Sequence, residues 1–276
     1  MMNDICPRIQ FKGFWDPHTG QKWFIDLLKR YNHSFTVLYH NNPDIIICSC
    51  FDNYHKCMDC SKKNVFYTGE NIRAIKEADL NLTFDNHSNY NNIRIPLWLF
   101  YRRPQDKIMT LSQKKTRYFC CFVYSNSVPH RNNFLKELSK YKTVHSGGRV
   151  LNNIRRRVKD KISFQKHFKF CIAYENSVQP GYTTEKIIEA YISNCIPIYY
   201  GSDTITDDFN PETFINAHDF DSNESLIEYI KKVDTDENLY NSYMNKPIYS
   251  KKWLEIFNDP NETYFKNIAQ KIIDLA

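Results

Sequence analysis

The segment Tyr182–Ser202, with the sequence YTTEKIIEAYISNCIPIYYGS, contains both signals that decide the fold class. Within Thr184–Asn194, apolar residues recur three and four positions apart, which is typical of an α-helix with one buried face. Ile196–Tyr200 is a short apolar run that ends at Gly201, and this pattern is typical of a buried strand. A helix that leads directly into a buried strand predicts an α/β protein with a parallel sheet.

The same alternation of strands and helices extends along the chain in both directions. We predict strands over Arg8–Trp15, Phe35–Tyr39, Asp44–Cys48, Asn64–Tyr67, Leu80–Phe84, Ile93–Leu99, Arg117–Ser125, Phe170–Tyr174 and Phe214–Phe220. Helices are predicted over Gln21–Tyr31 and Arg131–Tyr141, with two or three more within residues 223–276. The polar, proline-containing stretch Tyr101–Thr116 is interpreted as a linker. It divides the chain into a predicted N-terminal domain, residues 1–112, and a C-terminal domain, residues 113–276, that includes the terminal helices.

Composition excludes several classes of nucleotide-binding protein. The 276 residues include only seven glycines, and neither G-x-G-x-x-G nor the P-loop pattern G-x-x-x-x-G-K-[ST] occurs. Any bound phosphate must therefore be held by side chains and helix ends. The net charge of +6 is mild, and the densest basic stretch, Arg155–Lys161, is interpreted as a solvated surface. Because no zinc-finger, RRM or homeodomain pattern accompanies these charges, we expect no nucleic-acid partner.

Metal-ligand patterns are weak in this sequence. Cys57 and Cys60 form a lone C-x-x-C, and the nine histidines show no H-E-x-x-H spacing. Asp219 and Asp221 have the D-x-D form that binds metal in some nucleotide-sugar enzymes, but they follow a predicted strand and are interpreted as a turn. We therefore expect neither a metal nor another cofactor. With no signal sequence and no run of about 20 apolar residues, we expect a cytoplasmic protein without an integral membrane segment.

Two segments carry residues suited to catalysis or phosphate binding. Phe66–Asn71, FYTGEN, places Glu70 after a predicted strand, at the edge where open α/β sheets bind ligands. Glu70 is a candidate general base, although a solvated turn would have the same sequence. At the start of the helix quoted above, Thr183 or Thr184 is a good N-cap. Lys186 in the first turn is unfavourable against the helix dipole unless an anion lies beside it. That anion could be Glu185 or a bound phosphate.

Two further strand-to-helix junctions carry polar groups in the C-terminal half. Arg131 lies near the start of a predicted helix, where a cation is again unfavourable without a bound anion. The sequence Tyr174-Glu175-Asn176 ends a predicted buried strand. Together with Lys186, these groups predict a pocket for a nucleotide diphosphate.

These segments resemble the α-1,3/4-fucosyltransferases of glycosyltransferase family 10, in particular the bacterial-type soluble members. The resemblance covers nearly the whole chain and is carried by FYTGEN at 66–71, SNSVPHRNNFLKEL at 125–138, SGGRVLNN at 146–153, VKDKISF at 158–164, FCIAYEN at 170–176 and YTTEKIIEAYISNCIPIYYGS at 182–202. It implies a GT-B fold, in which two Rossmann-like domains face each other across a cleft and the C-terminal one holds most of the donor. It also implies that L-fucose is transferred from GDP-fucose to the O3 hydroxyl of GlcNAc or glucose in a glycan. This transfer would invert the anomeric centre and need no metal.

The resemblance further implies roles for individual residues. Glu70 matches the general base that deprotonates the acceptor hydroxyl, and Arg131 and Lys186 match the cations that contact the diphosphate. The remaining donor-binding positions, which contact the nucleotide, ribose or fucose, are Lys161, Asn176, Tyr182 and Glu185. The expected partners are thus GDP-fucose and an oligosaccharide or glycoconjugate acceptor.

The chain departs from the family pattern at two places. Tyr200 stands where many relatives have Trp, which leaves the acceptor preference open, and Asn194-Cys195 stands where many have a Gly-containing pair. Two alternatives also remain open: a related transferase for another GDP-sugar, and a catalytically inactive, glycan-binding homologue. The intact base and cations disfavour the inactive homologue.

Overall fold

The computed structural model describes residues 6–31, 33–39, 42–102, 109–112 and 118–276. The chain divides into an N-terminal unit, residues 1–100 with 256–276, and a C-terminal unit, residues 101–255. This division differs from the predicted single boundary after residue 112, because the end of the chain returns to the N-terminal unit. The helix α10, Thr263–Ile273, buries Ile268, Ala269 and Ile272 there. Beside it, the Tyr31 hydroxyl donates a hydrogen bond to the Glu262 carboxylate at 2.9 Å.

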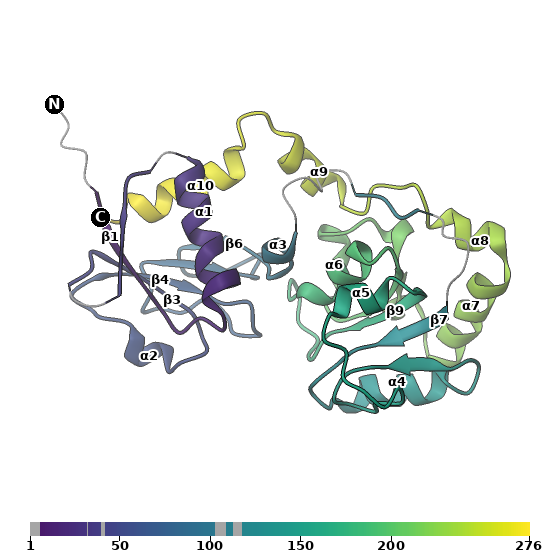
Figure 1. The fold of residues 1–276 in the computed structure, drawn as a ribbon. Helices are drawn as coiled ribbons and strands as arrows, with labels where there is room; N and C mark the ends of the chain where they lie inside the picture. The colour runs from purple at the N-terminus through teal and green to yellow at the C-terminus, as the bar shows by residue number, and fades with distance from the viewer. Residues whose placement is uncertain (1–5, 32, 40–41, 103–108, 113–117) are drawn as a thin grey trace. The chain divides into compact units, whose positions relative to one another are not determined.

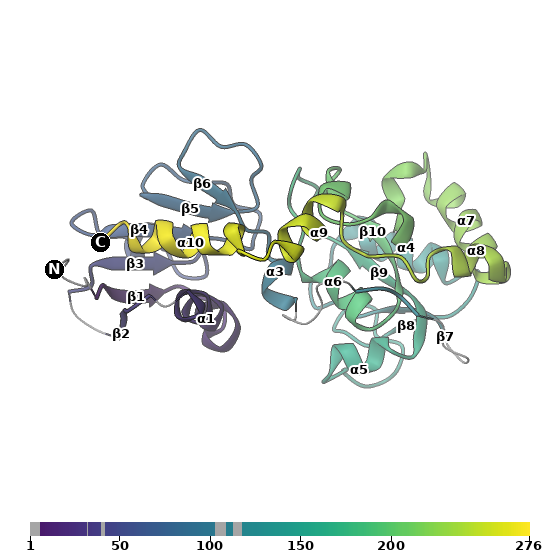
Figure 2. The same ribbon diagram turned by 90° about the horizontal axis from the view of Figure 1, so that it is seen from above.

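The N-terminal unit contains a six-stranded sheet with the order β2-β1-β3-β4-β5-β6. All its strand pairs are parallel. The strands are β1 (Arg8–Lys12), β2 (Thr36–Leu38), β3 (Ile45–Cys48), β4 (Lys63–Tyr67), β5 (Leu80–Thr83) and β6 (Asn92–Arg94). The helices are a π-helical turn at Pro17–Gln21, α1 (Lys22–Arg30), α2 (Tyr54–Cys57), α3 (Trp98–Tyr101) and α10. Figure 1 shows α1 and α10 on one face of this sheet and α2 on the other, and Figure 2 shows the strands in their order.

The C-terminal unit contains a five-stranded sheet with the order β11-β10-β9-β7-β8. Its pairs are parallel as well. The strands are β7 (Tyr118–Phe122), β8 (Val144–Ser146), β9 (Phe168–Tyr174), β10 (Ile196–Tyr200) and β11 (Ile215–Asn216). The helices are α4 (Pro129–Leu138), α5 (Lys161–Gln165), α6 (Glu185–Ile192), α7 (Asn223–Thr235), α8 (Glu237–Ser242) and α9 (Lys251–Asn258), with 3-10 turns at Ile205–Asp207, Pro211–Thr213 and Ala217–Asp219.

The order of the C-terminal strands creates a topological switch point between β7 and β9. The connection from β7 through α4 runs to β8, whereas the connection from β9 through α6 runs the opposite way to β10. Right-handed crossovers therefore put α4 and α6 on opposite faces of the sheet, as Figure 1 shows. Open α/β sheets bind their ligands at the carboxyl ends of the strands beside such a point.

The predicted α/β class, with a parallel sheet in each of two units as in the GT-B type, is confirmed. Details differ where local patterns were ambiguous. The expected strand Ile93–Leu99 ends at Arg94 and is followed by α3, and residues 223–276 hold four helices rather than two or three. The expected linker lies partly outside the described residues, but its residues 109–112 pack on the C-terminal unit, where Thr110 bridges to Pro247. None of the described helices is long and apolar enough to cross a membrane.

Candidate functional site

A buried carboxylate at the end of β9 organises the start of α6. Glu175 follows the last residue of β9 and is 0% exposed. Its Oε1 accepts the backbone N–H of Thr184 at 2.8 Å, and its Oε2 accepts the hydroxyl of Thr184 at 2.7 Å. Thr184 is the N-cap residue, but its own side chain makes no capping hydrogen bond. Glu175 therefore fixes the N-cap residue in place, but the N-cap side chain does not cap the first-turn N–H groups of α6 as the sequence led us to expect.

Lys186 points its ammonium into the same cluster. Its Nζ lies 2.8 Å from Thr184 Oγ1, 3.0 Å from Glu175 Oε2 and 3.3 Å from Glu185 Oε1. Burial disfavours the charged ammonium, but the neighbouring Glu175 and Glu185 outweigh it and hold the pKa of Lys186 well above its ordinary value. The negative charge that the helix position of Lys186 requires is thus supplied within the chain, so that position does not by itself indicate a phosphate.

A second ion pair extends the cluster along α6. Lys161, the first residue of α5, pairs through Nζ with Glu189 Oε2. Burial alone would raise the pKa of Glu185, but Lys186 and Lys161 lower it to about 2. Burial raises the pKa of Glu189 despite its pairing with Lys161. Positive and negative side chains therefore alternate along this face, which keeps each buried charge beside an opposite one.

Arg131 lies on the other side of the switch point, in the first turn of α4, and is 0% exposed. Its Nη1 donates to Asn176 Oδ1 at 2.9 Å and to the Tyr174 carbonyl at 3.3 Å, and its Nη2 donates to the Asn126 carbonyl at 2.5 Å. The guanidinium Cζ lies 3.8 Å from the centre of the Tyr124 ring. Burial lowers the pKa of Arg131.

All these partners of Arg131 are neutral. Within the part of the chain that the structure describes, no carboxylate lies within ion-pair distance of its guanidinium, and its Nε has no hydrogen-bond partner. A buried charge is costly unless it is paired. Arg131 therefore has no direct ion pair among the described residues, and Glu175 and Glu185 favour its charge only from beyond ion-pair distance. A bound anion nearby would add to that stabilisation.

The loop before α6 and the end of β10 complete this part of the site. Gly181 has φ +81°, a left-handed conformation that favours glycine, and its N–H donates to Ser202 Oγ at 2.8 Å. The next residue, Tyr182, is buried.

At the end of β10, Tyr200 stacks on His218 with ring centres 4.6 Å apart, and its ring centre lies 5.3 Å from that of Tyr174. Tyr200, the residue that departs from the family pattern, is thus the centre of an aromatic group.

Glu70, the predicted base, belongs to the N-terminal unit. It follows β4 in a tight turn in which its N–H donates to Thr68 Oγ1 at 3.0 Å and its carbonyl accepts the N–H of Ile72 at 2.7 Å. A Cβ atom at Gly69 would lie 2.7 Å from Leu97 Cδ1, so this turn can be occupied only by glycine without a shift. Burial raises the pKa of the Cys50 thiol, and the nearby Glu70 charge adds to that rise. Glu70 itself remains half-buried.

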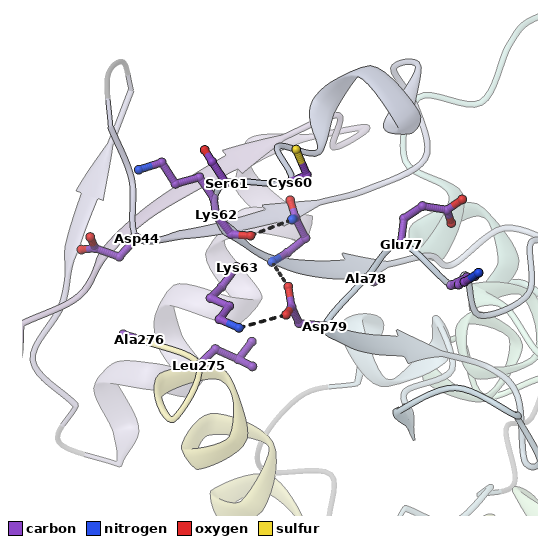
Figure 3. Close-up of a pocket in the computed structure, with 12 residues that line it drawn as sticks. Asp44, Cys60, Ser61, Lys62, Lys63, Glu77, Ala78, Asp79, Leu275 and Ala276 are labelled. Carbon is purple, nitrogen blue, oxygen red and sulfur yellow. Dashed lines mark hydrogen bonds and ion pairs between the residues drawn. The ribbon is translucent and has the colours of Figure 1, made fainter.

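Two cavities lie away from these residues. One, of about 620 Å³, is lined by residues that include Lys62, Lys63 and Asp79 (Figure 3). It lies at the start of β4, whereas Glu70 follows the end of that strand, and Lys63 is already paired with Asp79 at 3.2 Å. The other, of about 340 Å³, lies between β11 and α7. Neither cavity is lined by a predicted site residue, so we do not assign the donor to them.

The structure brings six of the seven predicted site residues into one unit. These are Arg131, Lys161, Asn176, Tyr182, Glu185 and Lys186, which follow β7 or β9 or lie on α5 and α6. The sequence reasoning named Glu175 only as part of a polar strand end and missed its role. The available signal was a Glu placed directly after a fully apolar strand.

The D-x-D segment lies in an exposed turn between β11 and α7. Asn216 Nδ2 donates to Asp219 Oδ1 at 3.1 Å, and Ser222 caps α7. No three His, Cys, Asp or Glu side chains gather as metal ligands among the described residues. Metal independence stays a prediction.

The structure is that of a doubly wound α/β protein with a parallel sheet in each unit. Charged side chains that include Arg131 and Lys186 gather at the switch point of the second sheet. The profile of glycosyltransferase family 10 (fucosyltransferase), C-terminal part, matches residues 112–261. The profile of the alpha-(1,3)-fucosyltransferase FucT N-terminal domain matches residues 9–101. The chain therefore belongs to glycosyltransferase family 10, and the resemblance deduced from the sequence is confirmed.

Individual relatives agree with this family. The chain is 31% identical over 251 residues to the alpha-(1,3)-fucosyltransferase FucT of Helicobacter pylori, covering 75% of this chain and 52% of the relative, so it spans about half of that protein. It is 32% identical over 200 residues to alpha-(1,3)-fucosyltransferase B of Drosophila melanogaster, covering 66% of this chain and 40% of the relative. A crystal structure of an α1,3-fucosyltransferase with GDP-fucose matches with TM-score 0.73 and 26% identity, over 96% of this chain and 90% of that one.

Proposed function

We propose that the chain transfers L-fucose from GDP-fucose to O3 of GlcNAc or glucose in a glycan acceptor, with inversion at the anomeric carbon and without a metal. Family membership and the structural likeness to a protein crystallised with GDP-fucose support the donor. The observation that carries the proposal within this chain is the buried Arg131 guanidinium, whose partners among the described residues are neutral. A diphosphate at the switch point would bring a further negative charge close to this guanidinium.

The C-terminal unit holds the donor in this proposal. Lys186 contacts the diphosphate directly, while the enclosed Arg131 acts through its charge and through Asn176, which it holds at 2.9 Å. Tyr182 and Glu185, with Asn176, contact the ribose or fucose, and Lys161 contacts the nucleotide. The donors of Lys186 and Arg131 are held by Thr184 and Asn176 before the ligand arrives, and such preorganisation favours electrostatic stabilisation of a leaving group.

Glu70 acts as the general base. Its carboxylate takes the proton of the acceptor hydroxyl as that oxygen bonds to C1 of fucose. The bond between C1 and the diphosphate oxygen breaks at the same time, and GDP departs with the electron pair. Attack from the face opposite the leaving group inverts C1. The positive charges of Arg131 and Lys186 stabilise the charge that develops on GDP.

A transfer assay tests this proposal. Incubation with GDP-fucose and an array of glycan acceptors should yield a fucosylated product whose NMR spectrum identifies an α-1,3 bond. GDP-mannose and UDP-sugars serve as controls, and tighter binding of a UDP-sugar would contradict the donor assignment. Glu70→Gln should lower kcat by a factor on the order of 10²–10⁴ while GDP-fucose affinity stays within a few-fold. Full activity in this variant would remove Glu70 as the base.

A further inference from the structure

The buried carboxylate of Glu175 belongs to the donor cluster, but the proposed function gives it no role. It is 0% exposed, and both of its oxygens are used inside the protein. One oxygen holds the Thr184 N–H at 2.8 Å, and the other lies 2.7 Å from the Thr184 hydroxyl and 3.0 Å from the Lys186 ammonium. Glu175 thus joins the end of β9 to both the backbone and the cation at the start of α6.

The neighbouring strand also keeps space for this side chain. The N–H of Glu175 donates to the Tyr200 carbonyl at 2.7 Å, which aligns the ends of β9 and β10. A Cβ atom at Gly201 would lie 2.5 Å from Cγ of Glu175 and 2.6 Å from the Tyr199 hydroxyl. Because atoms do not approach so closely, a larger residue at position 201 would push against both Glu175 and Tyr199. The glycine after β10 therefore leaves room for the Glu175 side chain.

We propose that Glu175 is a positioning residue for the donor: it holds the Lys186 ammonium and the first turn of α6 where the diphosphate binds. This inference rests on the proposed function, in which Lys186 contacts the diphosphate. A positioning role and a purely electrostatic role of Glu175 predict opposite changes in anion affinity. Removal of a carboxylate beside a phosphate site should strengthen anion binding if only charge matters, whereas loss of a positioning group should weaken it.

The test is the affinity of the whole chain for GDP, measured by calorimetry in Glu175→Gln. The glutamine oxygen can still accept the Thr184 N–H, which preserves the contact with the N-cap residue, but its amide NH2 cannot accept from the Lys186 ammonium. We expect the Kd for GDP to rise about tenfold or more, as for a truncated buried charge pair. An unchanged or lower Kd would overturn the proposal.

A double-mutant cycle with Lys186→Met shows whether Glu175 acts through Lys186. In the Lys186→Met background, Glu175→Gln should change the Kd for GDP by less than about twofold, since the group that it positions is gone. An equal loss in both backgrounds would refute the positioning role. Normal GDP affinity in Lys186→Met would contradict the proposed function. If Lys186→Met binds GDP more weakly and Glu175→Gln binds it normally, only the role of Glu175 would be contradicted.

Two further variants separate positioning from folding and from charge. Asp234→Asn is the matched control, because Asp234 is also a buried acid that bridges two lysines, Lys142 at 2.5 Å and Lys169 at 2.8 Å, but lies on α7. It should leave the Kd for GDP unchanged. Gly201→Ala displaces Glu175 without changing the net charge and should weaken GDP binding. A fully folded Gly201→Ala chain that binds GDP normally would also overturn the proposal.

Discussion

Lys186→Met should destabilise the C-terminal unit, because it removes the cation that two carboxylates share. The ammonium lies 3.0 Å from Glu175, which is 0% exposed, and 3.3 Å from Glu185. Methionine fills most of the same volume but supplies neither charge nor hydrogen bonds. The variant therefore leaves one carboxylate buried without an ion partner and the other with Lys161 alone.

The size of the loss follows from the Glu185 titration. Burial would raise the pKa of Glu185, but Lys186 and Lys161 lower it from 4.5 to about 2. A difference of about 2.5 units corresponds to roughly 3 kcal/mol of stability at neutral pH. In the variant, Lys161 still stabilises the Glu185 charge and so preserves part of these roughly 3 kcal/mol. Glu175, left without an ion partner, destabilises the fold further, since breaking a buried pair costs about 3–5 kcal/mol. We expect a net loss of about 3 kcal/mol.

The pH dependence identifies the cause. A lowered carboxylate pKa contributes stability above about pH 4.5, and this stability is lost as the pH falls toward 2. Lys186→Met removes much of this lowering, so the variant has less of this stability to lose. Urea unfolding should therefore show a difference between variant and wild type that shrinks as the pH falls from 4.5 toward 2.

A second substitution provides the control for this prediction. Adding Glu175→Gln to Lys186→Met removes the orphaned charge and should recover at least about 1 kcal/mol. A loss below about 1 kcal/mol at pH 7.5, or a loss that is the same at pH 7.5 and at about pH 3, would refute the reasoning.

Three other predictions address the metal, a backbone position and a distant ion pair. EDTA should leave the rate of fucose transfer unchanged, and its inhibition, reversed by a divalent cation, would contradict metal independence. Asn194 has φ +58°, and its side chain makes two 2.8 Å hydrogen bonds with the Ser112 backbone. Thermal unfolding should therefore show a loss of stability of about 1 kcal/mol in Asn194→Gly and a larger loss in Asn194→Val, because a β-branched residue is strained in a left-handed backbone. A larger loss in Asn194→Gly than in Asn194→Val would contradict this explanation. Burial would raise the pKa of Asp234, but Lys142 and Lys169 lower it. Asp234→Asn should therefore lower the free energy of unfolding by about 3 kcal/mol at pH 7, and urea unfolding should show that this loss fades as the pH falls below 3.8. A loss that does not change with pH would indicate a packing effect instead.

Much of the fold could be predicted because its signals are local. The apolar runs of β3, β4, β9 and β10 are fully or almost fully buried, as strands of a covered parallel sheet must be. Short elements such as β8 and α5 escaped prediction, since three to five residues do not complete a period. The return of α10 to the N-terminal unit also escaped, because it depends on contacts such as Tyr31 with Glu262, which are far apart in the sequence.

The candidate site was partly predictable for the same reason. Polar residues that directly follow apolar strands gather at one edge of a parallel sheet, which is why Arg131 and Asn176 were expected together and lie 2.9 Å apart. Asn194 stands in a pair where many relatives have glycine, but the same backbone conformation suits both residues. Its φ is left-handed, and glycine and asparagine are the residues that most readily adopt that conformation.

The sequence by itself determined the α/β class, the family and the positions that carry catalytic or cationic groups, because periodicity and motifs are properties of neighbouring residues. Only the tertiary structure decided how the charges are compensated. Lys186 has its counter-ions in Glu175 and Glu185, whereas Arg131 has neutral partners among the described residues. Whether a buried charge is paired depends on strands and helices that meet across the sheet. The water-poor interior that strengthens the attraction within such a pair, and the desolvation cost that this attraction must offset, exist only once these elements are packed.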